Sequence, residues 1–326
     1  MQNITIKNLG KKVLKLEVDA LKKLEKSIND SFSKIIRLIV TCKNGKIITS
    51  GVGKSGIIAK KWAATFSSTG TPSFFLDASN ASHGDLGQIT SNDIVILISN
   101  SGQSDELKNI IQYISRNKYI KLIGVTSKKD SLLYKNSDLK YLMPSLKEAG
   151  LGNIVPTSST TAQLALGDAI AIACMSYKNF TKLDFKKIHP SGSLSIKLKT
   201  VGDLMLTGKK IPIVNENIKM ERALKIINEK KLGVLLFKNF KGMTTGIITD
   251  GDLKRIVQKF KKFDNLNLKK IMTKNPISID IETLAASALS LMNTKKITSL
   301  CVHKNNKKRK TVGIIHMHDI LRSNIS

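Results

Sequence analysis

Three clusters of small polar residues could hold a phosphate. They are the glycine-rich segment 51–56 and the hydroxyl-rich segments 99–104 and 156–161. Capping of a helix start explains one serine or threonine per helix, but not five in a row. Glycines let backbone N–H groups approach a ligand oxygen, and a helix that follows them directs the positive end of its dipole to the same place. Together the three clusters indicate a ligand with a phosphate and a polyhydroxylated chain.

The first cluster, residues 51–56, is not a Walker A motif. That motif has a glycine five residues before the glycine that precedes its lysine, and this chain has Ile48 there. Taken alone, the cluster fits either a phosphate-binding loop or a tight strand-to-helix turn. The other two clusters favour the phosphate.

Apolar segments of strand length alternate with segments of helix length in the first half of the chain. The predicted strands are 46–50, 73–76, 93–98, 121–126 and 138–143, and the predicted helices are 13–40 (one helix or two), 57–68 and one from about 105. This alternation predicts an α/β fold with a parallel sheet covered on both faces. Ligands of such sheets bind at the carboxyl ends of the strands, where segments 51–56 and 99–104 fall.

The second half contains an internal repeat. Segment 203–205 recurs at 270–272, and segment 246–253 recurs at 313–320, both at an offset of 67 residues. Each unit is expected to contain a helix, two strands and a last helix whose N-cap is an aspartate. One such unit is too small to close a core alone, so the two must pack together.

Composition limits the classes of partner and compartment. The formal net charge is +30, but only six of the 54 basic residues are arginine, and the lysines are spread along the chain. Nucleic-acid surfaces favour arginine and stacking aromatics, so we expect no nucleic-acid partner.

The three cysteines form no CxxC pair, which indicates a reducing compartment. We expect neither a membrane span nor a signal peptide, because the apolar runs are too short, and therefore a cytoplasmic protein.

Seven motifs, in order, resemble one family. They are GxGKSG (51–56), STGTPSFF (68–75), ASHGDLG (81–87), SNSGxSxE (99–106), KE (147–148), PTSSTT (156–161) and HPSG (189–192). They are similar to the sugar isomerase (SIS) domain of arabinose-5-phosphate isomerases, and the repeat after them resembles that family's tandem CBS pair. The resemblance implies a doubly wound, flavodoxin-like SIS domain over residues 1–198. It also implies two α+β CBS modules, at 203–262 and 268–326.

The resemblance also implies an activity. Enzymes of this family interconvert D-arabinose 5-phosphate and D-ribulose 5-phosphate through an enediol. They feed synthesis of the lipopolysaccharide sugar Kdo, and they are typically cytosolic homotetramers. The chemistry needs a base near carbon, charge that stabilises an oxyanion, and an acid–base group near oxygen. It needs no cofactor and no metal.

Four catalytic positions of the family map onto Lys54, Glu106, Glu148 and His189. We assign Glu148 as the carbon base and Lys54 as the positive charge at the enediolate or phosphate. His189 would move the oxygen proton or open the furanose ring. Glu106 would share acid–base duty or orient its partners, although a carboxylate in the first turn of a helix also has a purely structural use.

The remaining candidates are assigned to substrate contacts. They are Gly53, Ser55, Gly70, Thr71, His83, Ser99, Asn100, Ser101, Gln103, Ser104, Ser158, Ser159 and Thr160. For His83, a loop histidine that only fixes backbone remains an alternative.

In the repeat, Thr249 and Asp252 fit the Thr/Asp pattern with which CBS pairs bracket a ribose. His316 replaces the hydroxyl in the second unit, so only one half-site has that pattern. A nucleotide ligand and a pair that only supports oligomerisation both remain open. Asp77 and Ser79 stand where relatives can carry histidine, so we expect no metal site there.

Three other functions compete with this one. A sugar-phosphate-sensing transcription regulator would need a helix-turn-helix domain, and too few residues precede the first strand for one. A non-catalytic sugar-phosphate-binding regulator would be free to lose its acid–base residues, and all four are present. An isomerase of another sugar phosphate is the closest alternative.

Overall fold

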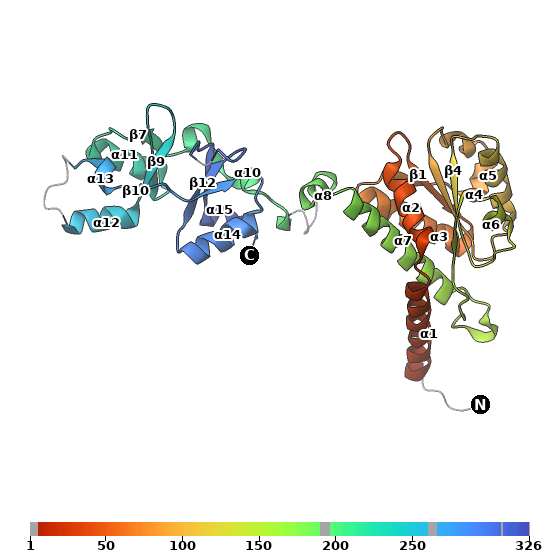
Figure 1. The fold of residues 1–326 in the computed structure, drawn as a ribbon. Coiled ribbons are helices and arrows are strands. Elements are labelled where there is room, and N and C mark those ends of the chain that lie inside the picture. Colours follow the sequence, from red (N-terminus) through yellow and green to blue (C-terminus); the bar gives the residue numbers. More distant parts are fainter. Residues whose placement is uncertain (1–5, 190–195, 260–265, 308, 326) are drawn as a thin grey trace. The chain divides into compact units, whose positions relative to one another are not determined.

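The structure is a computed structural model that describes residues 6–189, 196–259, 266–307 and 309–325. It divides into two compact units, residues 1–188 and 189–326 (Figure 1). The first unit holds all three polar clusters, and the second holds the repeat.

A five-stranded parallel sheet forms the centre of the first unit. Its strands are β1 (Ile47–Gly51), β2 (Ser73–Phe75), β3 (Ile94–Ile98), β4 (Lys121–Thr126) and β5 (Leu139–Leu142), in the spatial order β2-β1-β3-β4-β5. This is the flavodoxin-like order, in which the direction of winding reverses between β1 and β3. The predicted doubly wound parallel sheet is therefore confirmed.

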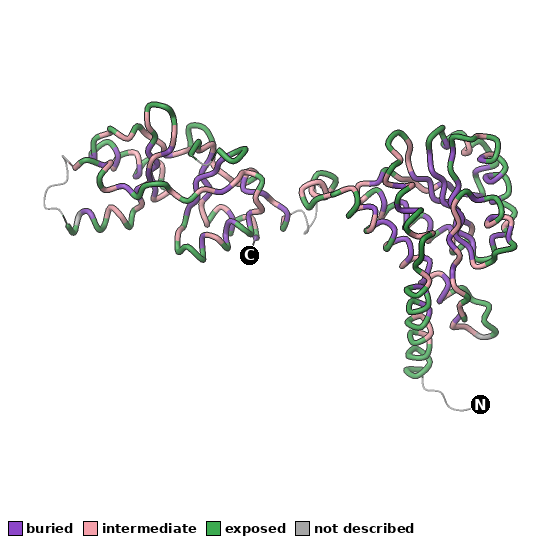
Figure 2. Tube along the Cα trace, in the orientation of Figure 1, coloured by how far each residue is buried: buried purple, intermediate pink, exposed green. Residues whose placement is uncertain are grey.

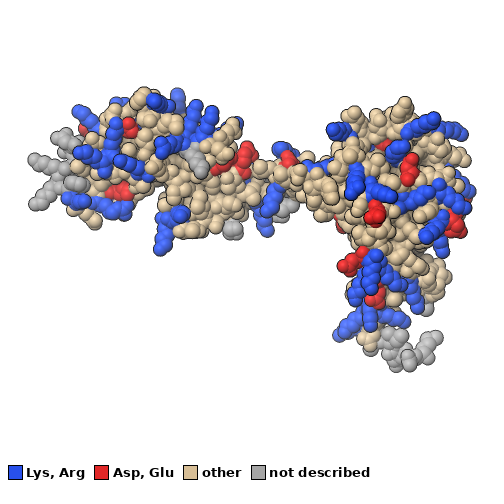
Figure 3. All heavy atoms as spheres, in the orientation of Figure 1, with Lys and Arg blue, Asp and Glu red and all other residues tan. Residues whose placement is uncertain are grey.

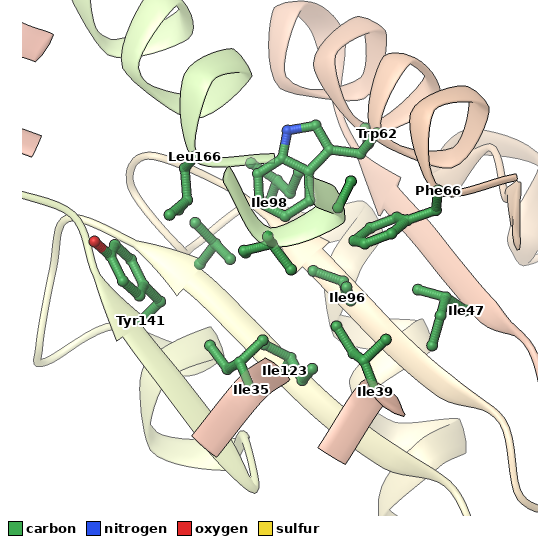
Figure 4. Close-up of a cluster of buried hydrophobic side chains, with 14 of the residues drawn as sticks. Ile35, Ile39, Ile47, Trp62, Phe66, Ile96, Ile98, Ile123, Tyr141 and Leu166 are labelled. Carbon is green, nitrogen blue, oxygen red and sulfur yellow. The ribbon is translucent and has the colours of Figure 1, made fainter. Parts of the chain in front are cut away.

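Helices cover both faces of this sheet. One face carries α1 (Ile6–Lys26), α2 (Asp30–Thr41), α3 (Gly53–Ser68) and α7 (Ser158–Tyr177), and the other carries α4 (Ala78–Ala81), α5 (Asp105–Ser115) and α6 (Leu132–Asn136). Side chains alternate between the two cores along each strand: Ile94, Ile96 and Ile98 enter the first, and Val95 and Leu97 the second. Figure 4 shows Trp62, Phe66 and Leu166 packed over the first face. Figure 2 shows the centre of the sheet as buried, and every residue of β1 and β3 is buried.

Two boundaries differ from the sequence-based expectation. The leading helical segment is two helices, because Asn29 caps α2 by accepting a hydrogen bond from the backbone N–H of Ser31 at 2.9 Å. Helix α3 begins at Gly53 rather than near Ile57, so the glycine motif itself forms its first turn. Gly56 permits this, because a Cβ there would lie 2.6 Å from the carbonyl oxygen of Gly51.

Short elements complete the first unit. They are the 3₁₀ turns Asp85–Gln88 and Leu151–Asn153, and α8 (Lys182–Ile188).

The second unit contains two four-stranded sheets. The first half supplies α10 (Val201–Leu204), β6 (Leu206–Thr207), the 3₁₀ turn Gly208–Lys210, β7 (Ile213–Asn215), α11 (Met220–Lys230), β8 (Val234–Lys238), β9 (Thr244–Thr249) and α12 (Asp250–Lys259). The second half supplies α13 (Leu268–Ile271), β10 (Thr273–Lys274), β11 (Ser278–Asp280), α14 (Ala285–Lys295), β12 (Ser299–His303), β13 (Gly313–His316) and α15 (Met317–Arg322). The strand orders of the two sheets are β10-β9-β8-β7 and β11-β12-β13-β6. The first strand of each half, β6 or β10, therefore belongs to the sheet of the other half.

This exchange explains the repeated residues. Met272 packs against Gly246, and Met205 packs against Gly313; in both cases a Cβ on the glycine would lie 2.3 Å from the methionine sulfur. Val234 and Leu236 share a core cluster with Ile314 of the other half. The expectation that the two halves must pack together is confirmed.

The N-caps of the last helix in each half differ from the expected aspartate. Thr249 caps α12, because its hydroxyl accepts a hydrogen bond from the N–H of Asp252 at 3.2 Å, while the carboxylate of Asp252 accepts from the N–H of Thr249 at 2.8 Å. This is a capping box, which satisfies two backbone donors at once. In the second half His316 caps α15 by accepting from the N–H of His318 at 3.2 Å.

Candidate active site

The glycine loop lies between β1 and α3, beside the end of β3. Gly51 pairs with Ile98, and a Cβ on Gly51 would lie 2.8 Å from the carbonyl oxygen of Ile98, so only glycine fits. Helix α3 has no side-chain N-cap and no acidic residue in its first turn. Its first N–H groups are therefore available to an anion, and exposed Lys54 adds positive charge in the same turn.

The Ser99–Ser104 loop directly follows β3. The hydroxyl of Ser99 accepts a hydrogen bond from the N–H of Gly102 at 3.0 Å and lies 3.4 Å from that of Ser104. Gly102 has φ +63°, in the left-handed region, and a Cβ there would meet the Ser131 hydroxyl at 2.4 Å. The loop therefore closes tightly behind Ser99. The side chains of Asn100, Ser101 and Gln103 are exposed.

Glu106 lies in the first turn of α5, immediately after this loop, and its side chain is exposed. The sequence pattern placed the loops after β1 and β3 at the carboxyl ends of parallel strands, and the pairing of β1 with β3 brings them side by side at the switch point.

Glu148 is buried, with 8% of its surface exposed, and caps the start of α7. Its Oε2 accepts hydrogen bonds from the N–H groups of Thr157 and Ser159 at 2.8 and 3.2 Å, and from the Thr157 hydroxyl at 3.1 Å. Burial raises the pKa of the Glu148 carboxyl, but these hydrogen bonds outweigh it and hold the pKa below its ordinary value. Glu148 is thus an ionised carboxylate at neutral pH.

The hydroxyls of segment 158–160 do not all face outward. The Ser158 hydroxyl is completely buried and has no hydrogen-bond partner among the described residues. Ser159 is also buried, and the Thr160 hydroxyl donates back to the carbonyl of Thr157 at 2.8 Å. These positions order the start of α7 in this structure, and their assignment to substrate contacts stays a prediction.

Gln163 joins the glycine loop to α7 and was not among the predicted residues. Its Oε1 accepts a hydrogen bond from the Ser55 hydroxyl at 3.3 Å, and its carbonyl oxygen accepts from Trp62 Nε1 at 2.9 Å. Its position four residues after Ser159, on the same face of a helix, was the available signal. Gln163 and Glu148 together connect three of the predicted segments.

Gly70 and Thr71 lie at the opposite edge of the sheet from the other candidates. They precede β2, whose first residue pairs with the first residue of β1. Thr71 is buried and accepts a hydrogen bond from Lys178 Nζ at 3.0 Å, and a Cβ on Gly70 would meet the ring of Phe180. Both residues lie away from the carboxyl edge of the strands, and their assignment to substrate contacts stays a prediction.

The two candidate histidines lie in different units. His83 is exposed, and its backbone N–H donates a hydrogen bond to the carbonyl oxygen of Asn80 at 2.9 Å. His189 directly follows α8 and is the first residue of the second unit. The rest of the HPSG motif lies outside the described residues.

A cleft of about 540 Å³ lies between the two halves of the repeat. Its lining includes Thr249, Asp252 and Arg255 from the first half, and Ser299 and His316 from the second. Burial raises the pKa of Asp252, but hydrogen bonds from Thr249 and Arg255 outweigh it and lower the pKa overall. Burial is the largest cause that lowers the pKa of His316 below its ordinary value, followed by the neighbouring His318.

Metal sites and membrane spans are both absent from the part of the chain that the structure describes. No cluster of three His, Cys, Asp or Glu side chains with the geometry of a metal site occurs within the described ranges. Of the helices in the described ranges, none combines the length and the apolar character needed to cross a bilayer. On the face shown in Figure 3, lysine and arginine are spread over both units.

Comparison with known proteins agrees with this architecture. The SIS domain model matches residues 39–173, and the CBS domain model matches residues 201–259 and 268–325. The arabinose 5-phosphate isomerase KdsD of Yersinia pestis is 40% identical over 99% of this chain and 97% of its own length. The chain belongs to the arabinose 5-phosphate isomerase family. The resemblance on which the sequence analysis relied is confirmed.

Two further proteins are similar to this chain. The uncharacterized protein RP505 of Rickettsia prowazekii is 42% identical over 98% of this chain and 97% of its own. The solved structure of Escherichia coli CFT073 c3406 in complex with arabinose 5-phosphate is 40% identical, with a TM-score of 0.56. The matched region covers 58% of this chain and 100% of the c3406 chain.

Proposed function

We propose that this chain interconverts D-arabinose 5-phosphate and D-ribulose 5-phosphate through an enediol, and so supplies synthesis of the lipopolysaccharide sugar Kdo. One observation carries the proposal: helix α7 is hydrogen-bonded to the uncapped start of α3 through Gln163 and Ser55, and its own start is capped by the buried carboxylate of Glu148. An anion site beside an ionised base is what an aldose–ketose isomerase of a sugar phosphate requires. Membership of the family and the arabinose 5-phosphate complex of a relative support the choice of substrate.

The phosphate group binds at the start of α3. The free N–H groups of the first turn, Lys54 and the Ser55 hydroxyl supply donors and positive charge. The Ser99–Ser104 loop adds donors from the neighbouring strand. This anchoring holds the sugar chain across the carboxyl ends of β1 and β3.

Glu148 moves the carbon proton. The carboxylate takes the proton from C2 of the aldose and returns it to C1, while a second proton moves from O2 to O1. Because three hydrogen bonds engage Oε2, we assign proton transfer to Oε1. Lys54 stabilises the enediolate or the phosphate, and Glu106 shares acid–base duty or orients its partners. His189, from a neighbouring subunit, moves the oxygen proton or opens the furanose ring.

Proton exchange followed by NMR tests this function. Chelator-treated protein is incubated with D-arabinose 5-phosphate in heavy water, beside Glu148→Gln. We expect ribulose 5-phosphate with deuterium at C1 from the wild type and none from the variant. Exchange only with other pentose or hexose phosphates would contradict the substrate. No exchange with any sugar phosphate would leave a non-catalytic binding protein.

The assembly we propose is a cytoplasmic homotetramer. Helix α1 carries an apolar stripe of Leu14, Val18 and Leu21, exposed by 63, 49 and 36%. Such a stripe is typical of a surface covered by another subunit. Free Cys42, Cys174 and Cys301 support a reducing compartment.

We also assign a nucleotide to the cleft of the CBS pair. Thr249 and Asp252 would hold the ribose, and the neighbouring guanidinium of Arg255 would compensate phosphate charge. The Ser299 hydroxyl supports this assignment, because it is buried at the cleft and has no hydrogen-bond partner among the described residues.

A further inference from the structure

Gln163 has a hydrogen-bonding group that the fold does not use. Its side chain is buried, with 1% exposed, and only Oε1 is engaged, by the Ser55 hydroxyl at 3.3 Å. The amide nitrogen, Nε2, has no hydrogen-bond partner among the described residues. The unpaired nitrogen lies beside the anion-binding loop.

The direction of the Ser55 hydrogen bond matters for phosphate binding. A hydroxyl has one hydrogen to donate, and in this structure Ser55 donates it to Gln163. Phosphate oxygens of a dianion only accept. In this arrangement, therefore, Ser55 cannot hydrogen-bond a phosphate.

The backbone of Gln163 is fixed close to α3. Trp62 Nε1 donates to its carbonyl at 2.9 Å, and Gly167 lets the indole approach so closely that a Cβ there would lie 2.1 Å from the ring nitrogen. Only the terminal amide can turn without disturbing this contact.

We propose that Gln163 is a positioning residue that redirects the Ser55 hydroxyl toward the phosphate by a half-turn of its side-chain amide. After the turn, Nε2 donates to Ser55 Oγ, and the hydroxyl hydrogen points to a phosphate oxygen. The turn breaks no second hydrogen bond, because Nε2 has no partner among the described residues in the starting state. A phosphomonoester dianion, which needs donors, selects the turned state. This inference rests on the proposed function, since it requires the phosphate to bind at the start of α3.

The test is Gln163→Glu, which keeps the shape but, when ionised, can only accept. At pH 7.5 we expect the KM for D-arabinose 5-phosphate to rise at least about tenfold, with kcat changed less than about twofold. The inhibition constant of inorganic phosphate should rise by a similar factor. Lowering the pH protonates the new carboxyl and restores a donor, so the ratio of variant to wild-type KM should shrink.

The same substitution made in Ser55→Ala protein distinguishes this mechanism from charge repulsion. In Ser55→Ala protein, adding Gln163→Glu should change KM little, because the hydroxyl that Gln163 directs is gone. Repulsion between the new carboxylate and the phosphate would persist there, and a persisting rise would overturn the proposal. Gln112→Glu makes the same change on the exposed face of α5, and its KM should be that of the wild type.

A third variant is used if thermal unfolding shows that Gln163→Glu does not fold. Gln163→Met removes both hydrogen-bonding atoms without adding charge, and its KM should also exceed the wild-type value. A wild-type KM in either folded variant overturns the role of Gln163 while the isomerase function stands. A wild type that neither isomerises the sugar phosphate nor binds inorganic phosphate refutes the proposed function instead.

Discussion

At the residue scale, the carboxylate of Glu148 both caps the start of α7 and is the proposed base for the carbon proton. Hydrogen bonds from Thr157 and Ser159 keep the carboxylate ionised and fixed, which suits a base that must be deprotonated before substrate arrives. The same bonds lower its basicity, so its catalytic strength must come from position more than from pKa. We expect Glu148→Gln to reduce kcat at least about 100-fold with a smaller change in KM, as measured by steady-state kinetics.

The capping role of Glu148 predicts a dependence of stability on pH. A carboxyl whose folded pKa is depressed stabilises the fold above its ordinary pKa of 4.5, and this contribution is lost as the pH falls through the folded pKa. Urea unfolding at neutral pH should show Glu148→Gln less stable than the wild type by about 1 kcal/mol. The difference in unfolding free energy between the wild type and Glu148→Gln should become smaller below pH 4.5. A difference that is constant with pH would contradict the capping role.

Lys54 is predicted to act by charge in the first turn of α3. Lys54→Met should lower kcat/KM about 100-fold or more, because the enediolate or phosphate loses its nearest cation. Lys60→Met, on the exposed side of the same helix, removes an equal charge away from the loop and serves as the control. Equal effects of the two substitutions would indicate a general electrostatic effect of net charge rather than a site.

At the scale of elements, the strand-to-helix turn between β1 and α3 depends on two glycines for close packing. Gly56→Ala places a Cβ 2.6 Å from the Gly51 carbonyl oxygen, so the first turn of α3 must move. We expect kcat/KM to fall and the melting temperature to drop by several degrees. Gly10→Ala is the matched control: nothing lies within 4 Å of its Cβ in α1, and it should stabilise the protein slightly. Full activity of Gly56→Ala would show that the turn is not part of the site.

At the scale of the whole molecule, the apolar stripe of α1 predicts self-association. Light scattering should show a tetramer for the wild type. Leu14→Gln with Val18→Gln should shift the population to smaller species, because exposed apolar surface no longer needs covering. Lys15→Gln with Lys22→Gln changes exposed charges on the same helix and should leave the tetramer intact. A wild-type monomer would contradict the assembly.

The cleft of the CBS pair predicts ligand binding apart from the isomerase site. Titration calorimetry with AMP should detect binding to the wild type and a loss of about tenfold or more in affinity for Asp252→Asn. Asp250→Asn is the neighbouring control in the same first turn of α12. Wild-type protein that binds no adenine nucleotide would favour a pair that only supports oligomerisation.

The sequence by itself determined the local patterns of this protein. Strand length and alternation with helices predicted a parallel sheet covered on both faces, and the 67-residue repeat predicted two units that pack together, because periodicity is set by neighbouring residues. The position of the loops after β1 and β3 at one edge of the sheet also follows, since the carboxyl ends of parallel strands share that edge, whereas the pairing of β1 with β3 was decided by the tertiary structure. Family motifs then pointed to Lys54 and Glu148.

Only the tertiary structure decided which side chains share a partner. Gln163 contacts Ser55 across 108 positions of sequence, and no local pattern encodes so distant a contact. Gly70 and Thr71 follow a helix that carries the chain back to the amino edge of the sheet, away from the loops after β1 and β3. The caps of α7, α12 and α15 likewise depend on which polar atom reaches the free N–H groups, and that is settled when the chain folds.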